Sequence, residues 1–383
     1  MFDVDLLVIG GGCAGLSLAL RMAEGAGSID SVLLLEAREA YSDDRTWCFW
    51  RTRSHRFEAL VEAQWSSFEV RHGGRTQRLS CEDTPYQMIP SIGFYRHALD
   101  RIEASPRVNL DLGVSVTADP EPDGEGWVVH TPGRSIRARY VVDTRPPSVV
   151  PDCLLWQSFL GQVVRTGHEA FESGTALLMD FDEPSSRWVR FTYVLPRTAQ
   201  EALVETTVFA TRPLGAEELR EVHQMGLERR LGTEDMEVLR SEYGALPMGV
   251  TTAADPVPWI RAGLFHGGAR PSTGYAFQRI QTWAESCADS LRFGLGPRGP
   301  RPDPVVRRWM DTVFLNVLSA DPARGPELLF RLFSGAAPAR VIRFLSDEGS
   351  ALDSLAVVRS LPPSPFLRQA GARLLGRAGG AIR

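Results

Sequence analysis

Three glycines near the start of the chain have the spacing of a phosphate-binding turn. Residues 6–9 form a short apolar run that predicts a strand buried on both faces, and they lead into Gly10-x-Gly12-x-x-Gly15 and a helical stretch. In such a turn one glycine permits the bend, one lets the backbone approach a pyrophosphate, and one lets helix and strand pack closely. The free N–H groups of the helix then face the phosphates. We therefore predict a dinucleotide site at Gly10, Gly12, Cys13, Ala14 and Gly15.

An acidic residue follows the second predicted strand. Residues 31–35 are mostly apolar and end at Glu36, about 20 residues beyond Gly15. A carboxylate at this position in a dinucleotide-binding unit meets the ribose hydroxyls. The alternative is an ordinary α/β unit with a glycine turn. The combination of strand, turn, helix, strand and acid favours the dinucleotide site.

Further cofactor contacts are expected from three later segments. Arg45 begins a run of one basic and three aromatic side chains directly behind the second strand. Residues 138–143 predict a third parallel strand whose carboxyl end, Asp143, faces the cofactor. Residues 260–275 predict a strand, a glycine-rich loop and a helix that begins near Gly274, with Ser272 or Thr273 as its N-cap. The loop residues expected to bring backbone N–H groups against the cofactor are Gly267, Gly268, Thr273 and Gly274.

Glu205 is the candidate for proton chemistry. The predicted strand at 201–209 alternates so that Leu203, Glu205, Thr207 and Phe209 share one face. If that face is buried, loss of hydration favours the protonated acid at neutral pH, and such a group can donate a proton. The alternative is a glutamate on the wet face of an edge strand.

Composition narrows the class of protein. A chain of 383 residues with 43% hydrophobic residues is expected to form more than one packed region. A net charge of −5 does not favour nucleic-acid binding. The five cysteines are scattered without a Cys-x-x-Cys pair, which predicts neither disulfides nor a metal site and fits a reducing cytoplasm.

Membrane contact is expected to be peripheral. The chain starts without the basic segment of a signal peptide, and no apolar run approaches the roughly 20 residues that span a bilayer. Residues 366–383 contain four arginines, no acid and several apolar residues. This tail fits either a helix on an anionic membrane surface or a frayed terminal helix.

The elements that must position these residues predict an α/β fold with a Rossmann-type domain. Short strands alternate with helices in 1–60, 91–150 and 241–300, which we assign to a discontinuous dinucleotide-binding domain. Segments 61–90 and 151–240 predict an antiparallel substrate sheet, with charged helical stretches at 216–222 and 234–239. Residues 301–383 predict a helical C-terminal region, and 294–299 repeat the glycine spacing but form a proline-rich linker.

Five motifs together resemble the flavin-dependent lycopene cyclases of bacterial carotenoid pathways. They are Asp44-Arg-Thr-Trp-Cys-Phe-Trp50, Met179-Asp-Phe181, Leu203-Val-Glu205-Thr, Tyr243-Gly-x-Leu-Pro-Met248 and Pro271-Ser-Thr-Gly-Tyr-x-Phe277. The resemblance implies that the glycine turn and Glu36 bind FAD, and that Glu205 takes part in acid–base catalysis. Other branches of the family place a histidine where this chain has Arg270, so a role for that histidine does not transfer.

The resemblance implies a cyclisation without net oxidation. The family uses reduced FAD, with NAD(P)H as the source of electrons, and closes the ψ-end groups of lycopene to β-ionone rings through a carbocation. Negative charge on the reduced flavin would stabilise that cation, and the rings of Trp47 or Trp50 could add a cation–π contribution. The sequence does not distinguish β from ε or γ rings.

Two other functions remain open at this point. One is a flavin-dependent monooxygenase acting on a polyprenyl or aromatic substrate, which would consume oxygen. The other is a carotenoid-binding flavoprotein without catalysis, which would bind lycopene and leave its absorption spectrum unshifted.

Overall fold

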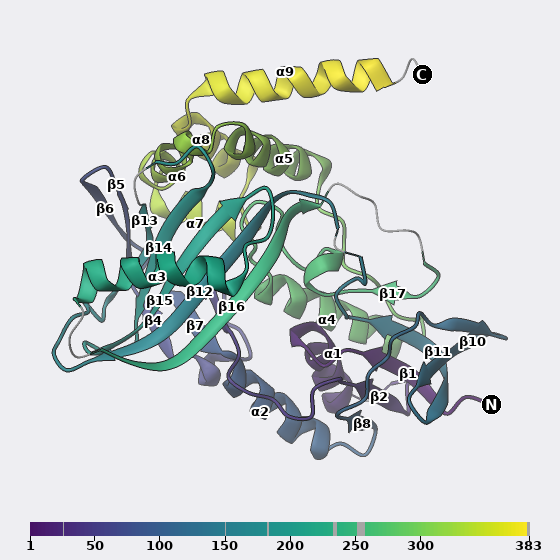
Figure 1. Cartoon of the computed structure of the whole chain (residues 1–383). Coiled ribbons are helices and arrows are strands. Elements are labelled where there is room, and N and C mark those ends of the chain that lie inside the picture. Colours follow the sequence, from purple (N-terminus) through teal and green to yellow (C-terminus); the bar gives the residue numbers. More distant parts are fainter. Residues whose placement is uncertain (26, 150, 182–183, 233–235, 251–256, 381–383) are drawn as a thin grey trace.

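The chain folds into sheet layers flanked by helices (Figure 1). The computed structural model describes residues 1–25, 27–149, 151–181, 184–232, 236–250 and 257–380, with the backbone alone for 372–380. Within these ranges the strands form three sheets.

The first sheet is mainly parallel and contains the amino-terminal strand. Its order is β8 (Val108–Asp111), β2 (Val32–Leu35), β1 (Val4–Ile9), β11 (Arg134–Asp143), β10 (Gly126–Thr131) and β9 (Glu121–Asp123), and β17 (Ile260–Arg261) pairs with β11. Neighbouring strands from β8 to β11 pair in parallel, whereas β10 pairs antiparallel with both β11 and β9. The predicted third parallel strand at 138–143 is therefore confirmed as part of β11.

Strand β1 is apolar because both of its faces are covered. Leu6 and Val8 pack in a core formed with α1 (Cys13–Glu24), α2 (Ser91–Glu103) and α4 (Phe277–Arg292). Leu7 and Ile9 belong to a second core on the opposite face of the sheet. This double burial confirms the prediction made from residues 6–9.

The second sheet is large and almost entirely antiparallel. Its order is β16 (Met236–Val250), β12 (Cys153–Thr166), β15 (Glu201–Ala210), β14 (Val189–Pro196), β13 (Thr175–Phe181), β5 (Ser67–His72) and β6 (Arg75–Ser80). Among its described strands, only β13 and β5 pair in parallel. A third, small sheet consists of β3 (Thr46–Trp50), β7 (Tyr86–Pro90) and β4 (Ala63–Trp65). Its strand β3 contains the three aromatic residues that follow Arg45.

The two faces of the large sheet have different covers. Val204 and Val208 of β15 lie in cores with residues of α3 (Ala216–Leu231) and the loop before it. Leu203 and Phe209 pack in a core with the C-terminal helices. Those helices are α5 (Val305–Ala320), α6 (Gly325–Ser334), α7 (Pro338–Leu345), α8 (Ala351–Ser360) and α9 (Pro363–Gly380). Figure 1 shows α9 on the outside of this group, in yellow. The predicted fold class, with its Rossmann-type unit, antiparallel sheet and helical C-terminal region, is confirmed.

Several local predictions need correction. Residues 236–239 begin strand β16 and are not helical, and residues 234–235 lie outside the described residues. Residues 241–250, assigned to the dinucleotide-binding segments, continue β16 in the large sheet beside β12. The helix expected near Gly274 begins at Phe277 with Ala276 as its N-cap, and no side chain caps it. Backbone bonds from Thr273 and Gly274 to the Arg270 carbonyl hold this loop in turns instead.

The C-terminal tail continues as a helix to Gly380, as predicted for this region. The last three residues of this tail, 381–383, lie outside the described residues. Among the helices in the described part of the chain, none has the length and apolar character needed to cross a bilayer.

Candidate active site

The glycine turn between β1 and α1 has the geometry that its spacing predicts. Gly10 has a φ of +94°, a backbone conformation that favours glycine. A Cβ on Gly15 would lie 1.9 Å from the Gly10 carbonyl oxygen, so helix and turn are in close contact there. A Cβ on Gly12 would meet no atom within 4 Å. The turn is thus closed at Gly10 and Gly15 and open at Gly12, the side from which an anion can approach the first N–H groups of α1.

Glu36 lies beside this turn at the end of β2. Its carboxylate accepts a hydrogen bond from the Gly11 N–H at 2.6 Å and one from Arg38 Nε at 3.0 Å. Burial raises the pKa of Glu36, but these hydrogen bonds and the Arg38 charge outweigh it, so the pKa falls below its ordinary value. Glu36 therefore carries a negative charge next to the glycine turn.

A cavity of about 700 Å³ extends from the glycine turn to the large sheet. It brings together most of the predicted cofactor residues, namely Gly10, Gly12, Cys13, Ala14, Glu36, Arg45, Thr273 and Gly274. Arg45 is half-exposed and pairs with Asp44 at 3.2 Å. Burial raises the pKa of the Cys13 thiol to about 12, so it stays neutral. Glu205 lines the same cavity from the sheet side.

Four predicted cofactor residues lie behind the cavity wall and do not line it. Gly15 packs beneath the turn, and Asp143 is buried at the end of β11, where it pairs with Arg145 at 2.7 Å. Gly268 is tucked against Gly263, whose carbonyl oxygen would lie 2.5 Å from an added Cβ, and Gly267 borders a different hollow. Besides Thr273, Gly274 and Tyr275, the residues of this segment that line the cavity are Gly263, Leu264 and Phe265. The glycine spacing indicated Gly267 and Gly268 instead, but the chain turns at Gly263, where the Gly268 N–H donates to the Gly263 carbonyl at 2.9 Å, and these two glycines lie away from the opening.

Glu205 projects from the middle of β15 into the cavity. Its neighbours Leu203 and Phe209 are buried on the same face, which confirms that this face is covered and not wet. The Thr207 hydroxyl donates a hydrogen bond to Glu205 Oε1 at 2.8 Å. Burial, and then the negative charge of Glu242, raise the pKa of Glu205 to about 8. Glu205 is therefore mainly protonated at neutral pH.

Glu242 is a cavity residue that the sequence analysis missed. It lies in β16, is 5% exposed, accepts a hydrogen bond from Thr46 Oγ1 at 2.9 Å and forms an ion pair with Arg240 at 2.8 Å. Burial raises its pKa, opposed by Arg240 and Thr46. Reading 236–250 as a strand would have placed Arg240 and Glu242 on one face, next to the Tyr243 motif. The mistaken helix prediction hid that alternation.

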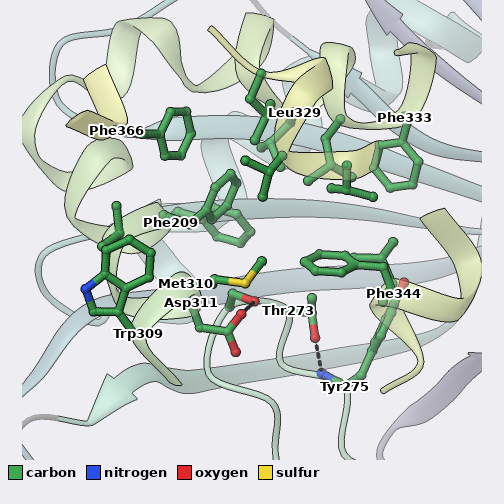
Figure 2. A pocket seen from close by; sticks show the side chains of 18 of the residues that line it. Phe209, Thr273, Tyr275, Trp309, Met310, Asp311, Leu329, Phe333, Phe344 and Phe366 are labelled. Carbon is green, nitrogen blue, oxygen red and sulfur yellow. Dashed lines mark hydrogen bonds between the residues drawn. The ribbon is translucent and has the colours of Figure 1, made fainter. Parts of the chain in front are cut away.

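A second, apolar cavity of about 280 Å³ adjoins the first (Figure 2). The two share Gln157, Tyr193, Thr273 and Tyr275, so they meet along one face of the large sheet. Figure 2 shows aromatic and aliphatic side chains of the sheet and of the C-terminal helices around it, among them Phe209, Trp309, Met310, Leu329, Phe333, Phe344 and Phe366. A long apolar molecule that enters here would reach the Glu205 end of the larger cavity.

The two tryptophans considered for cation–π contacts differ in position. Trp47 lines the larger cavity and stacks on Phe277, with ring centroids 5.2 Å apart. Trp50 is 2% exposed, packs on Tyr86 and does not line that cavity. Arg270 is also removed from it: its guanidinium is buried against Asp311 at 3.1 Å and joins the glycine loop to α5.

Comparison with known proteins agrees with this arrangement. The family model described as lycopene cyclase protein matches residues 5–371. A lycopene beta-cyclase of Pseudescherichia vulneris is 27% identical over 385 residues, which cover 94% of this chain and 95% of that protein.

Solved structures share the fold at low sequence identity. The p-nitrophenol 4-monooxygenase of Pseudomonas putida DLL-E4 superposes with a TM-score of 0.61 at 15% identity, over 94% of this chain and 98% of the other. Aklavinone-11 hydroxylase, solved with FAD and aklavinone, gives a TM-score of 0.53 at 14% identity, over 76% of this chain and 62% of the other. These two likenesses concern the fold. Because the family model spans residues 5–371, this chain belongs to the lycopene cyclase family.

Proposed function

We propose that this chain is an FAD-dependent lycopene cyclase that closes the ψ-end groups of lycopene, or of a related acyclic carotenoid, to β-ionone rings. The observation that carries the proposal is the position of Glu205. It is a carboxyl group with a raised pKa, in a cavity that runs from a phosphate-binding turn to an apolar chamber. A neutral acid at the end of an apolar chamber is the arrangement that protonation of a hydrocarbon requires.

The glycine turn fits the FAD that the proposal requires. The space beside Gly12 and the first N–H groups of α1 would hold the pyrophosphate, and Glu36 lies where it can meet ribose hydroxyls. Gly263, Thr273 and Gly274 would border the remainder of the cofactor. When bound in its reduced form, with NAD(P)H as the source of electrons, the flavin supplies negative charge that stabilises a neighbouring cation.

The protein's own residues supply the proton and exclude water. Glu205 donates its proton to the terminal double bond of the substrate, which leaves a tertiary carbocation. The next double bond attacks this cation, and loss of a proton from the new ring completes an isomerisation. Tyr193 and Tyr275 are partly buried and line the junction of the two cavities, and loss of hydration raises the pKa of both, so both side chains stay neutral. Exclusion of water prevents capture of the cation.

The apolar surface next to the smaller cavity supports a peripheral position on the inner face of the cell membrane. Val358 and Leu367 line that cavity and are also 48% and 69% exposed, and Val305 and Val306 of α5 are 71% and 69% exposed. The sequence of 366–383 adds four arginines and no acid. Apolar side chains beside basic ones favour contact with an anionic lipid surface, from which a carotenoid could enter the cavity directly.

The test is expression of the chain in cells that accumulate lycopene, followed by chromatography and mass spectrometry of the pigments. A cyclase converts lycopene to products of unchanged mass, and the purified protein does so without oxygen once its flavin is reduced. A product heavier by one oxygen atom would instead indicate a monooxygenase. Unaltered lycopene bound to the protein would indicate a carrier.

A further inference from the structure

Glu205 and Glu242 form a pair across one strand of the large sheet. Gly161 of β12 is the direct partner of Glu205 in β15 and also of Glu242 in β16. Direct partners project to the same face of a sheet. The Cα atoms of the two glutamates are therefore two strand spacings apart, roughly 10 Å, and their side chains can lean toward each other. Both line the larger cavity.

Gly161 keeps the space between these side chains empty. A Cβ there would lie 3.1 Å from Glu242 Cγ and 3.5 Å from Glu205 Cβ. A side chain at this position would therefore crowd both glutamates and also Leu203, whose Cδ1 would lie 3.2 Å from the added Cβ.

The partners of the two carboxyl groups are unequal. Glu242 forms an ion pair with Arg240 at 2.8 Å and accepts a hydrogen bond from Thr46 at 2.9 Å, and Arg240 also pairs with Asp43 at 3.3 Å. Within the described parts of the chain, Glu205 has no ion-pair partner. The one side chain there that forms a hydrogen bond with it is Thr207. A single negative charge on the pair is therefore better stabilised at Glu242, and the proton is better placed on Glu205.

The other titratable groups near Glu205 are neutral at neutral pH. They are Cys48 on β3, Tyr193 on β14 and Tyr275 before α4, and burial raises the pKa of each above its ordinary value. Near Glu242, Arg45 and Asp43 add opposite charges from the segment before β3. Glu242 is thus the neighbouring charge that acts on Glu205.

We propose that Glu242 is a positioning residue, whose carboxylate keeps the single proton of the pair on Glu205, where the substrate can take it. The inference rests on the proposed role of Glu205. One proton leaves Glu205 for the substrate and one is released from the new ring. The pair takes up the proton that the ring releases and so regains its single proton, and the reaction remains an isomerisation.

The first test is the pH profile of cyclisation by flavin-loaded Glu242→Gln. Activity needs protonated Glu205, so in the unchanged protein it falls as the pH rises through about 8. Without the Glu242 charge the pKa of Glu205 falls, and this alkaline limb should move about one unit or more toward acid. The rate above pH 8 should then drop about tenfold, with little change at low pH. Glu242→Asp, which keeps the charge, should move the limb back toward its original position.

The matched control is Glu237→Gln. Glu237 lies on the same strand, is exposed and pairs with Arg165 at 3.2 Å, so its removal should leave the pH profile unchanged. A uniformly lower rate in Glu242→Gln, with the limb at its original pH, would indicate a structural role and overturn the proposal.

A second readout does not depend on cyclisation. Difference infrared spectra report the C=O band of a protonated carboxyl group, and the band that is lost in Glu205→Gln belongs to Glu205. Its titration midpoint should fall in Glu242→Gln and stay unchanged in Glu237→Gln. An unchanged midpoint in Glu242→Gln overturns the pairing. If the chain forms no ring at all, the proposed function fails while this titration still decides whether the pair exists.

Discussion

Glu36 and Glu205 line the same cavity, yet their surroundings move their pKa values in opposite directions. At the glycine-turn end, Glu36 receives hydrogen bonds from Arg38 and from the Gly11 N–H, and its pKa is lowered. At the sheet end, Glu205 accepts a hydrogen bond from the Thr207 hydroxyl and forms no ion pair with a described residue. A second carboxyl group, that of Glu242, lies across Gly161. Its pKa is raised to about 8.

This contrast shows that burial does not by itself assign a role to a carboxyl group. Both glutamates are shielded from bulk water, and burial opposes the charged form of each. The partners decide the outcome: a guanidinium and an amide keep Glu36 charged, whereas Glu205 has no such partner among the described residues, so burial and then the charge of Glu242 raise its pKa.

The most damaging change at the sheet end should be Glu205→Gln. The amide cannot donate an acidic proton, so cyclisation should fall by about a hundredfold or more, the usual contribution of a positioned acid. Bound flavin, measured by its absorption, should be retained because the change lies away from the glycine turn. Full cyclase activity in this variant would refute the role of Glu205.

At the other end, two glycine substitutions should separate packing from binding. In Gly15→Ala the new Cβ would lie 1.9 Å from the Gly10 carbonyl oxygen, so stability should fall by about 1–3 kcal/mol. In Gly12→Ala the Cβ meets no protein atom within 4 Å, so the thermal midpoint of the flavin-free protein should stay unchanged while FAD binding weakens. Melting curves and flavin titrations check the pair. Equal loss of stability in both variants would contradict the assigned roles of the glycines.

The pH dependence of unfolding should carry opposite signs for the two glutamates. Glu36, with its lowered pKa, adds stability above the unfolded value of 4.5, and this is lost as the pH falls through its folded pKa. Glu205, with its raised pKa, binds a proton more tightly when folded, so its contribution declines as the pH rises from 4.5 to about 8. Denaturant unfolding across this range should therefore show a shallower decline in Glu205→Gln. Parallel curves for that variant and the unchanged protein would contradict the raised pKa.

The smallest effect is expected from Thr207→Val. The Thr207 hydroxyl donates to the charged form of Glu205, so its removal should raise the pKa of Glu205 further. A hydrogen bond to a carboxylate contributes about 1.5–3 kcal/mol and one to the protonated acid about 1 kcal/mol, so the difference should move the alkaline limb of the rate profile up by about one unit. A shift toward acid would show that the hydroxyl does not act on Glu205 in this way.

Local sequence patterns predicted much of this architecture. The alternation in 201–209 correctly placed Leu203, Glu205 and Phe209 on one covered face, because strand period depends on neighbouring residues alone. The bend at Gly10 and the close packing at Gly15 were predicted for the same reason. Charged residues misled the helix prediction at 236–239, where pairing with β12 overrides local propensity.

Contacts between distant segments could not be read in this way. Pairing on both sides of β12 brings Glu242 to Glu205 across Gly161, and Gly268 is drawn behind the wall by its contact with Gly263. Spacing along the chain therefore sufficed for the turn and for the face of each strand, since both follow from short-range backbone geometry. The charge state of Glu205 depends on which groups the folded sheets bring near it, because electrostatic interactions act through space and not along the chain.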